Sequence, residues 1–355
     1  MDEFEINDIR SDNEFKGVTF SKFKKTEAKK ELINSLSNGK IEYALNWSAE
    51  FICCGSFIEL WDIILNFVGK HIHIGNPKLP IYLELRFNNF KEIISNYIGF
   101  EINMRNNDKV RKLFAEIITI ICNSKKKHSI ESIKIKKQEE FDMTTMSTRL
   151  KAPAINYASE IFKKDDPKEL FIAMNELAYH LSKDSLTSLD ACYWIEWILE
   201  FENLCKKKKE VCICERRAFV KVDEKFQKEP IWLIWDIIFH INSKNKSEIS
   251  KKILKSIFEL FCIRYTSGSK RKRKYLIYFA VSIITEKFDD KINIIQNKEV
   301  VDNITKKINL IYKELKKNEE KPATDYLFNG IEKSNTEKTI EKLEMLREMD
   351  TLIRV

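Results

Sequence analysis

Glycine and proline are scarce in this sequence, which has eight glycines and six prolines among 355 residues. Average usage is about 7% and 5%, so glycine-rich phosphate loops and tight hairpins are largely excluded. Apolar residues make up 43% of the chain and recur in short runs separated by charged residues. This pattern favours helices, and the length suffices for one large or two medium domains with a continuous core.

Motifs that carry familiar chemistry are also missing. The sequence contains no G-x-x-x-x-G-K-[ST] phosphate loop, no G-x-G-x-x-G, no G-x-S-x-G elbow and no H-E-x-x-H. The five histidines are scattered along the chain. These absences favour a protein that is not an enzyme.

Long uncharged stretches are absent as well. The most apolar windows, 194–201 and 231–241, are interrupted by Glu196, Glu200 and Asp236, whereas a membrane helix needs about 20 apolar residues. The eight cysteines lie mostly in apolar stretches, and the first residues lack a signal-peptide pattern. We therefore expect no membrane partner, reduced thiols and a cytosol-like compartment.

Hydrophobic periodicity divides the chain into four parts. We predict an N-terminal arm at 1–24, a first helical unit at 25–140 and a second helical unit at 150–317 with a long cysteine- and lysine-rich loop at 205–229. A charged helical tail follows at 318–355. Within it, 336–353 should form an amphipathic helix whose thin apolar stripe suits either a peripheral strut or a partner-binding helix.

The second unit repeats the residue order of the first. Three groups of residues recur in the same order: Lys30-Glu31-Leu32, Ala44-x-x-Trp47-x-x-Glu50 and Leu60-Trp61-Asp62-Ile63-Ile64, then Lys168-Glu169-Leu170, Ala191-x-x-Trp194-x-x-Trp197-x-x-Glu200 and Ile234-Trp235-Asp236-Ile237-Ile238. Chance similarity between short apolar helices is one explanation, and duplication of a helical unit is the one we favour. The predicted fold is all-α, with helical hairpins stacked as an α-solenoid or HEAT-like array.

Two basic clusters are the candidates for a nucleic-acid interface in a chain of net charge +8. The first contains Lys270, Arg271, Lys272, Arg273 and Lys274, at the start of a predicted helix whose free N–H groups also favour an anion. The second contains Lys206, Lys207, Lys208, Lys209, Arg216 and Arg217. The duplication could place both on one side of the array, where they would contact RNA or DNA phosphates. A nuclear-import-like signal and a solvated loop are the alternatives.

The cysteine-rich loop is the candidate for a metal site. Cys205, Cys212 and Cys214 are spaced C-x6-C-x-C, whereas structural zinc sites commonly use C-x-x-C pairs and need four ligands. Cys192, His180 or His240 would have to supply the fourth. A zinc clip that fixes the loop is one interpretation, and free thiols in a half-buried loop are the other. No other cofactor is expected.

Four segments carry a resemblance to a viral family. They are Trp47-Ser48-Ala49-Glu50-Phe51-Ile52, Asn76-Pro77-Lys78-Leu79-Pro80-Ile81-Tyr82-Leu83-Glu84, Cys192-Tyr193-Trp194-Ile195-Glu196-Trp197 and Cys212-Ile213-Cys214-Glu215-Arg216-Arg217. Here, and over roughly residues 17–315, the chain resembles uncharacterised proteins of giant DNA viruses of the mimivirus type. The resemblance implies a protein made in the host cytoplasm that acts in or near the viral factory. It transfers no catalytic residue.

These observations predict a non-enzymatic scaffold or adaptor that binds protein partners and, through its basic clusters, RNA or DNA during viral gene expression. In architecture it would look like the helical-repeat middle domain of translation-initiation scaffolds, an analogy of fold alone. The alternative is a minor structural protein of the virion, or a helical accessory subunit of the viral replication or transcription machinery.

Overall fold

Helices form every regular element in the part of the chain that the structure describes. The computed structural model describes residues 3–97, 101–135, 141–244 and 247–320. Within these ranges an isolated β-bridge joins Val18 to Lys24, and no strand is formed. The predicted all-α class is therefore confirmed. The tail helix predicted at 336–353 lies outside the described residues.

In its described residues the first unit contains five α-helices, which are α1 (Lys25–Ser37), α2 (Ile41–Cys53), α3 (Phe57–Phe67), α4 (Leu79–Ile94) and α5 (Asp108–Asn123). Helices α1 and α2 form a hairpin through Gly39, whose φ of +66° suits a residue without a Cβ. On α3, Trp61 is fully buried among the rings of Phe87, Phe90 and Phe114. This aromatic group forms much of the core of the unit.

The second unit is built in a similar way. Its helices are α7 (Phe171–Leu181), α8 (Ser188–Lys208), α9 (Ile231–Ser243), α10 (Glu248–Phe261), the short α11 (Ser269–Lys272) and α12 (Lys274–Thr285), preceded by α6 (Met143–Arg149). On α9, Trp235 is fully buried and packs on Phe239, Phe258 and Phe261. In both Trp61-Asp62 and Trp235-Asp236, the tryptophan therefore lies in the core.

The two units share part of their pattern of helix contacts, although α9 lies closer to α10 and α12 than α3 does to α4 and α5. In chain order, α1 to α5 correspond to α7, α8, α9, α10 and α12. The hairpin α1–α2 matches α7–α8, the packing of α2 on α5 matches that of α8 on α12, and the packing of α4 on α5 matches that of α10 on α12. This correspondence agrees with duplication of a helical unit, which remains a prediction.

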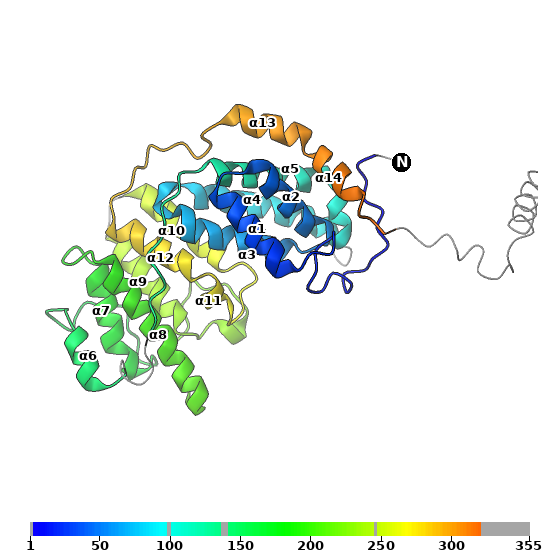
Figure 1. Ribbon diagram of the computed structural model, residues 1–355. Helices are drawn as coiled ribbons and strands as arrows, with labels where there is room; N and C mark the ends of the chain where they lie inside the picture. The colour runs from blue at the N-terminus through cyan, green and yellow to red at the C-terminus, as the bar shows by residue number, and fades with distance from the viewer. Residues whose placement is uncertain (1–2, 98–100, 136–140, 245–246, 321–355) are drawn as a thin grey trace, which may run out of the picture.

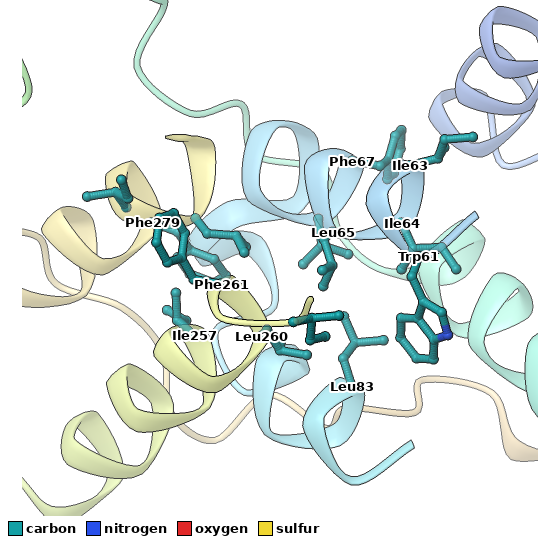
Figure 2. Close-up of a cluster of buried hydrophobic side chains, with 14 of the residues drawn as sticks. Trp61, Ile63, Ile64, Leu65, Phe67, Leu83, Ile257, Leu260, Phe261 and Phe279 are labelled. Carbon is teal, nitrogen blue, oxygen red and sulfur yellow. The ribbon is translucent and has the colours of Figure 1, made fainter. Parts of the chain in front are cut away.

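The units meet along a continuous apolar junction. Helix α4 packs against the corresponding helix α10, and α12 packs against the π-helix η1 (Val68–Ile72) that follows α3. Figure 2 shows buried side chains of α3, α4, α10 and α12 in one cluster, including Leu65, Leu83, Phe261 and Phe279. Gly69 permits the close approach of α12, since a Cβ on it would lie 2.9 Å from the carbonyl carbon of Tyr275.

The arm and the last described helices cover the first unit. Helix α13 (Lys298–Lys307) lies along α5, and α14 (Asn309–Lys316) lies against α2. Residues predicted within the second unit therefore pack on the first (Figure 1). In the arm, Phe15 and Phe20 are buried. The described helices include none with the length and apolar character that a membrane span needs.

Candidate nucleic-acid interface

The first basic cluster is divided between interior and surface. Lys270 is only 3% exposed, and its ammonium group donates to both carboxylate oxygens of Glu202, at 2.6 and 2.5 Å, and to Glu229 at 2.9 Å. Tyr265 donates its hydroxyl to the same Glu229 at 2.7 Å. Because an unpaired buried charge would be strongly destabilising, the two carboxylates are what makes the burial of Lys270 possible. Lys270 does not belong to an exposed interface.

Arg273 is buried as well, at 3% exposure. Its guanidinium group donates to Asp62 of α3 at 3.0 and 2.7 Å, and to the carbonyl oxygens of Phe261 and Ile263. The half-buried Lys274 donates to Glu196 at 3.0 Å. The sequence prediction that the first cluster binds nucleic acid is therefore wrong for Lys270 and Arg273, whose N–H groups already donate to protein acceptors.

Three exposed cations from the two clusters line the same hollow. Arg271 and Lys272 lie on the surface, and Arg271 donates to Glu200 on α8 at 2.9 Å. Lys206, Lys207 and Arg271 line one shallow hollow of about 290 Å³. These three residues therefore lie close together, whereas the binding of a nucleic acid to them stays a prediction.

The end of α8 extends this surface. Lys208 and Lys209 are exposed there, and the end of the helix projects from the body of the protein in Figure 1. Lys209 ends the helix in the left-handed conformation, with φ 60°. Cations in the last turn also complement the negative end of the helix dipole. The run Lys206 to Lys209 therefore has a structural explanation beside a functional one.

Arg216 and Arg217 differ sharply in their surroundings. Arg216 is exposed, whereas Arg217 is 2% exposed and donates to Asp166 at 3.0 and 2.7 Å and to Asp236 at 2.7 Å. The predicted phosphate contact at Arg217 is therefore wrong, because its guanidinium group connects the loop to α9. The nucleic-acid candidates that remain exposed are Lys206, Lys207, Lys208, Lys209, Arg216, Arg271 and Lys272.

The three loop cysteines lie in different surroundings. The thiol of Cys212 is hydrogen-bonded to that of Cys205, whereas Cys214 is buried in the core. Burial raises the pKa of Cys212 to about 12 and also raises that of Cys205, so both thiols stay protonated near neutral pH. Throughout the described ranges no three His, Cys, Asp or Glu side chains are grouped to hold a metal ion.

The candidate fourth zinc ligands lie in other settings. Cys192 is fully buried on α8. His180 is held by Thr187 and Ser185, at 2.6 and 3.1 Å from its Nδ1 atom, and His240 lies 3.2 Å from a carboxylate oxygen of Glu160. None of the eight cysteines forms a disulfide bond.

Sequence reasoning missed a groove between α2, α13 and α14. It has a volume of about 570 Å³, and its lining is mainly apolar, including Leu45, Ile308 and Ile311. At its edges Tyr43 and Leu310 are 64% and 55% exposed. The signal that the sequence offers is Tyr43, an aromatic residue on the outer face of α2. The helices that complete the groove lie more than two hundred residues further along the chain.

The chain matches no protein-family model, and no curated protein or solved structure is significantly similar to it.

Proposed function

We propose that this protein is a non-enzymatic helical scaffold that binds an amphipathic helix of a protein partner in the groove between α2, α13 and α14. The apolar lining of that groove, with Tyr43 and Leu310 open to solvent, is the observation that carries the proposal. A contiguous exposed apolar surface is typical of an interaction site. A helix with apolar residues at i, i+3, i+4 and i+7 would cover it.

The charges around the groove suit such a partner. Glu42, Lys307 and Glu314 line it beside the apolar residues, so both signs of charge are present. Mixed charges at the rim select the register and orientation of a bound helix more than they add affinity. The partner that fits best is therefore amphipathic, with charges of both signs beside its apolar stripe.

The exposed cations form a second proposed surface, for RNA. Lys206, Lys207 and Arg271 line one hollow, and Lys208 and Lys209 continue it along α8. Glu200 lies in the same hollow and pairs with Arg271. Binding here would rest on phosphate contacts and would weaken steeply with salt.

The two units are proposed to be copies of one HEAT-like arrangement of hairpins. Each unit has a buried tryptophan followed by an aspartate, and each aspartate accepts from a buried arginine: Asp62 from Arg273, and Asp236 from Arg217. The matched order of helix contacts supports the same idea.

The resemblance to giant-virus proteins suggests the setting of the proposed scaffold. It would act in the cytoplasm of infected cells, in or near the viral factory, during viral gene expression. A role in translation initiation is the concrete version we favour, by architectural analogy.

Affinity purification from infected cells tests the proposal. The tagged protein is compared with Leu310→Glu, which places a charge in the groove, and with Ile155→Glu, a matched control at a site that is 77% exposed elsewhere. We expect translation or transcription factors to copurify with the unmodified protein and with Ile155→Glu even after nuclease treatment. Leu310→Glu should no longer recover them. Recovery of capsid and core proteins alone would instead favour a structural role in the particle.

A chain truncated after residue 320 identifies the occupant of the groove. If the predicted tail helix at 336–353 were the occupant, a synthetic peptide of that sequence would bind the truncated chain and Leu310→Glu would abolish its binding. Partner capture that is unchanged by the truncation would support a helix from another protein.

A further inference from the structure

A cleft of a different kind lies where the two units meet. One hollow of about 320 Å³ is bounded by α3 and α4 on one side and by α10 and the 205–229 loop on the other. A second hollow of about 420 Å³ adjoins it. Both are lined by Lys221, Cys262 and Arg264. Junctions between units and volumes of this size are typical of small-molecule sites.

The first hollow combines aromatic walls with a cationic rim. Its apolar lining includes the rings of Phe87, Phe90, Phe219 and Phe258. Phe219 packs edge-on against Phe258, with their ring centroids 5.5 Å apart, so the ring positions are fixed by packing. The charged residues of the lining are Lys91, Lys221, Arg264 and Glu259. Three cations against one carboxylate favour an anionic ligand.

Arg264 lines the cleft and has a positive φ angle. Its φ is 39°, in a region that non-glycine residues seldom adopt. Strain of this kind clusters at ligand sites, where the surrounding structure maintains it. The side chain of Arg264 is more than half exposed, and the ion pair of its guanidinium group with Glu101 is long at 3.8 Å. The charge of Arg264 is thus weakly neutralised by the protein.

The second hollow is more polar. It is lined by Asp223, Tyr265 and Thr266 in addition to the shared residues. An aspartate and a threonine can hydrogen-bond ligand hydroxyl groups. The first hollow therefore supplies aromatic rings, the shared residues supply cations, and the second hollow supplies groups that can bind a hydroxyl.

We propose that the cleft binds a small amphipathic anion of nucleotide size. A flat ring would occupy the first hollow, its phosphate would lie between Lys221 and Arg264, and its hydroxyl groups would face Asp223 and Thr266. The proposal is independent of the scaffold function, because it uses residues outside the α2–α13–α14 groove and outside the exposed cations of α8.

Binding of an aromatic anion tests this site directly. The full chain is titrated with 8-anilinonaphthalene-1-sulfonate, followed by competition with adenosine monophosphate and, separately, with decanoate. We expect adenosine monophosphate to displace the dye. We also expect Lys221→Glu with Arg264→Glu to weaken dye binding on the order of tenfold. Lys208→Glu with Lys228→Glu, two exposed lysines of the 205–229 segment that do not line the cleft, is the control with the same change in net charge.

Several outcomes would overturn the proposal. Equal dye affinity in the double variant and the control would show that the cationic rim plays no part. Displacement by decanoate but not by adenosine monophosphate would contradict a ligand of the nucleotide class and favour an alkyl carboxylate. Loss of dye binding in Leu310→Glu alone would place the dye in the groove of α2 instead.

Cys262 gives a second readout within the unmodified protein. It is half-buried and lines both hollows, whereas the half-buried Cys212 lies outside them. Adenosine monophosphate should slow alkylation of Cys262 by N-ethylmaleimide severalfold, measured by peptide mass spectrometry, and leave Cys212 unchanged. Equal rates at Cys262 with and without the nucleotide would contradict the site.

Discussion

Arg273 donates two hydrogen bonds to Asp62, 211 residues earlier in the chain, at 3.0 and 2.7 Å. The pair joins the start of α12 in the second unit to α3 in the first. Arg217 donates in a similar way to Asp236, at 2.7 Å. Asp62 and Asp236 each follow a buried tryptophan, and each accepts at least one hydrogen bond from a buried arginine.

Replacement of Arg273 by lysine should destabilise the fold. A lysine keeps the charge but loses the planar fork that satisfies Asp62 together with the carbonyl oxygens of Phe261 and Ile263. We expect a loss of about 2–3 kcal/mol in the free energy of unfolding, measured with urea. Arg271→Lys, at an exposed neighbour, should change it by less than about 0.5 kcal/mol. Equal effects would show that the buried hydrogen bonds of Arg273 contribute little.

Gly69→Ala should loosen the junction between the units. A Cβ at this position would lie 2.9 Å from the carbonyl carbon of Tyr275 and 3.0 Å from the amide nitrogen of Leu276, both in the backbone of α12. The helices must separate to admit it, at a cost of about 1–3 kcal/mol. Gly268→Ala is the matched control, since its nearest neighbour would be 3.8 Å away. Similar thermal unfolding of both variants would argue against close packing at Gly69.

Acidification should destabilise the protein through His73. Its ring is buried and hydrogen-bonds Ser282 at 2.8 Å, and burial lowers the pKa of His73 to about 4. Since the unfolded chain has a histidine pKa near 6.5, it binds the proton more readily than the folded chain between those values. The contribution is fully present above about pH 6.5 and is lost as the pH falls through about 4.

The variant His73→Asn tests this dependence. Asparagine tolerates the positive φ of 48° at this position and can still hydrogen-bond, but it does not titrate. The free energy of unfolding, compared at pH 7.5 and 4.5, should fall less in the variant. Part of the fall should remain, because burial also lowers the pKa of His71 to about 4. An identical fall in both proteins would contradict the assignment to His73.

The helical class could be predicted because it depends on local periodicity, whereas the fate of the basic clusters could not. Lys270 and Arg273 look like solvated cations until Glu202 and Asp62, distant in sequence, are placed beside them. Nothing in the spacing of the cluster reveals those partners. The same limit applies to the groove, because α13 reaches the first unit only in three dimensions.

Charge reversal of Lys207 and Lys208 should weaken RNA binding. Both are exposed near the end of α8, away from the buried ion pair of Lys270 with Glu202. Affinity for a fluorescent single-stranded RNA, measured by anisotropy at several salt concentrations, should fall in the double glutamate variant. The slope of log affinity against log salt should decrease by about 0.7 for each RNA phosphate that the variant no longer neutralises.

A matched double reversal, Lys29→Glu with Lys30→Glu, distinguishes a local site from net charge. These two lysines are exposed on α1, and the variant has the same net charge as the first. If the basic surface of α8 binds RNA, the α1 variant should lose far less affinity and keep the original salt slope. Equal losses would mean that RNA responds only to the overall positive charge, and the proposed RNA surface would then be abandoned while the protein-binding groove would still stand.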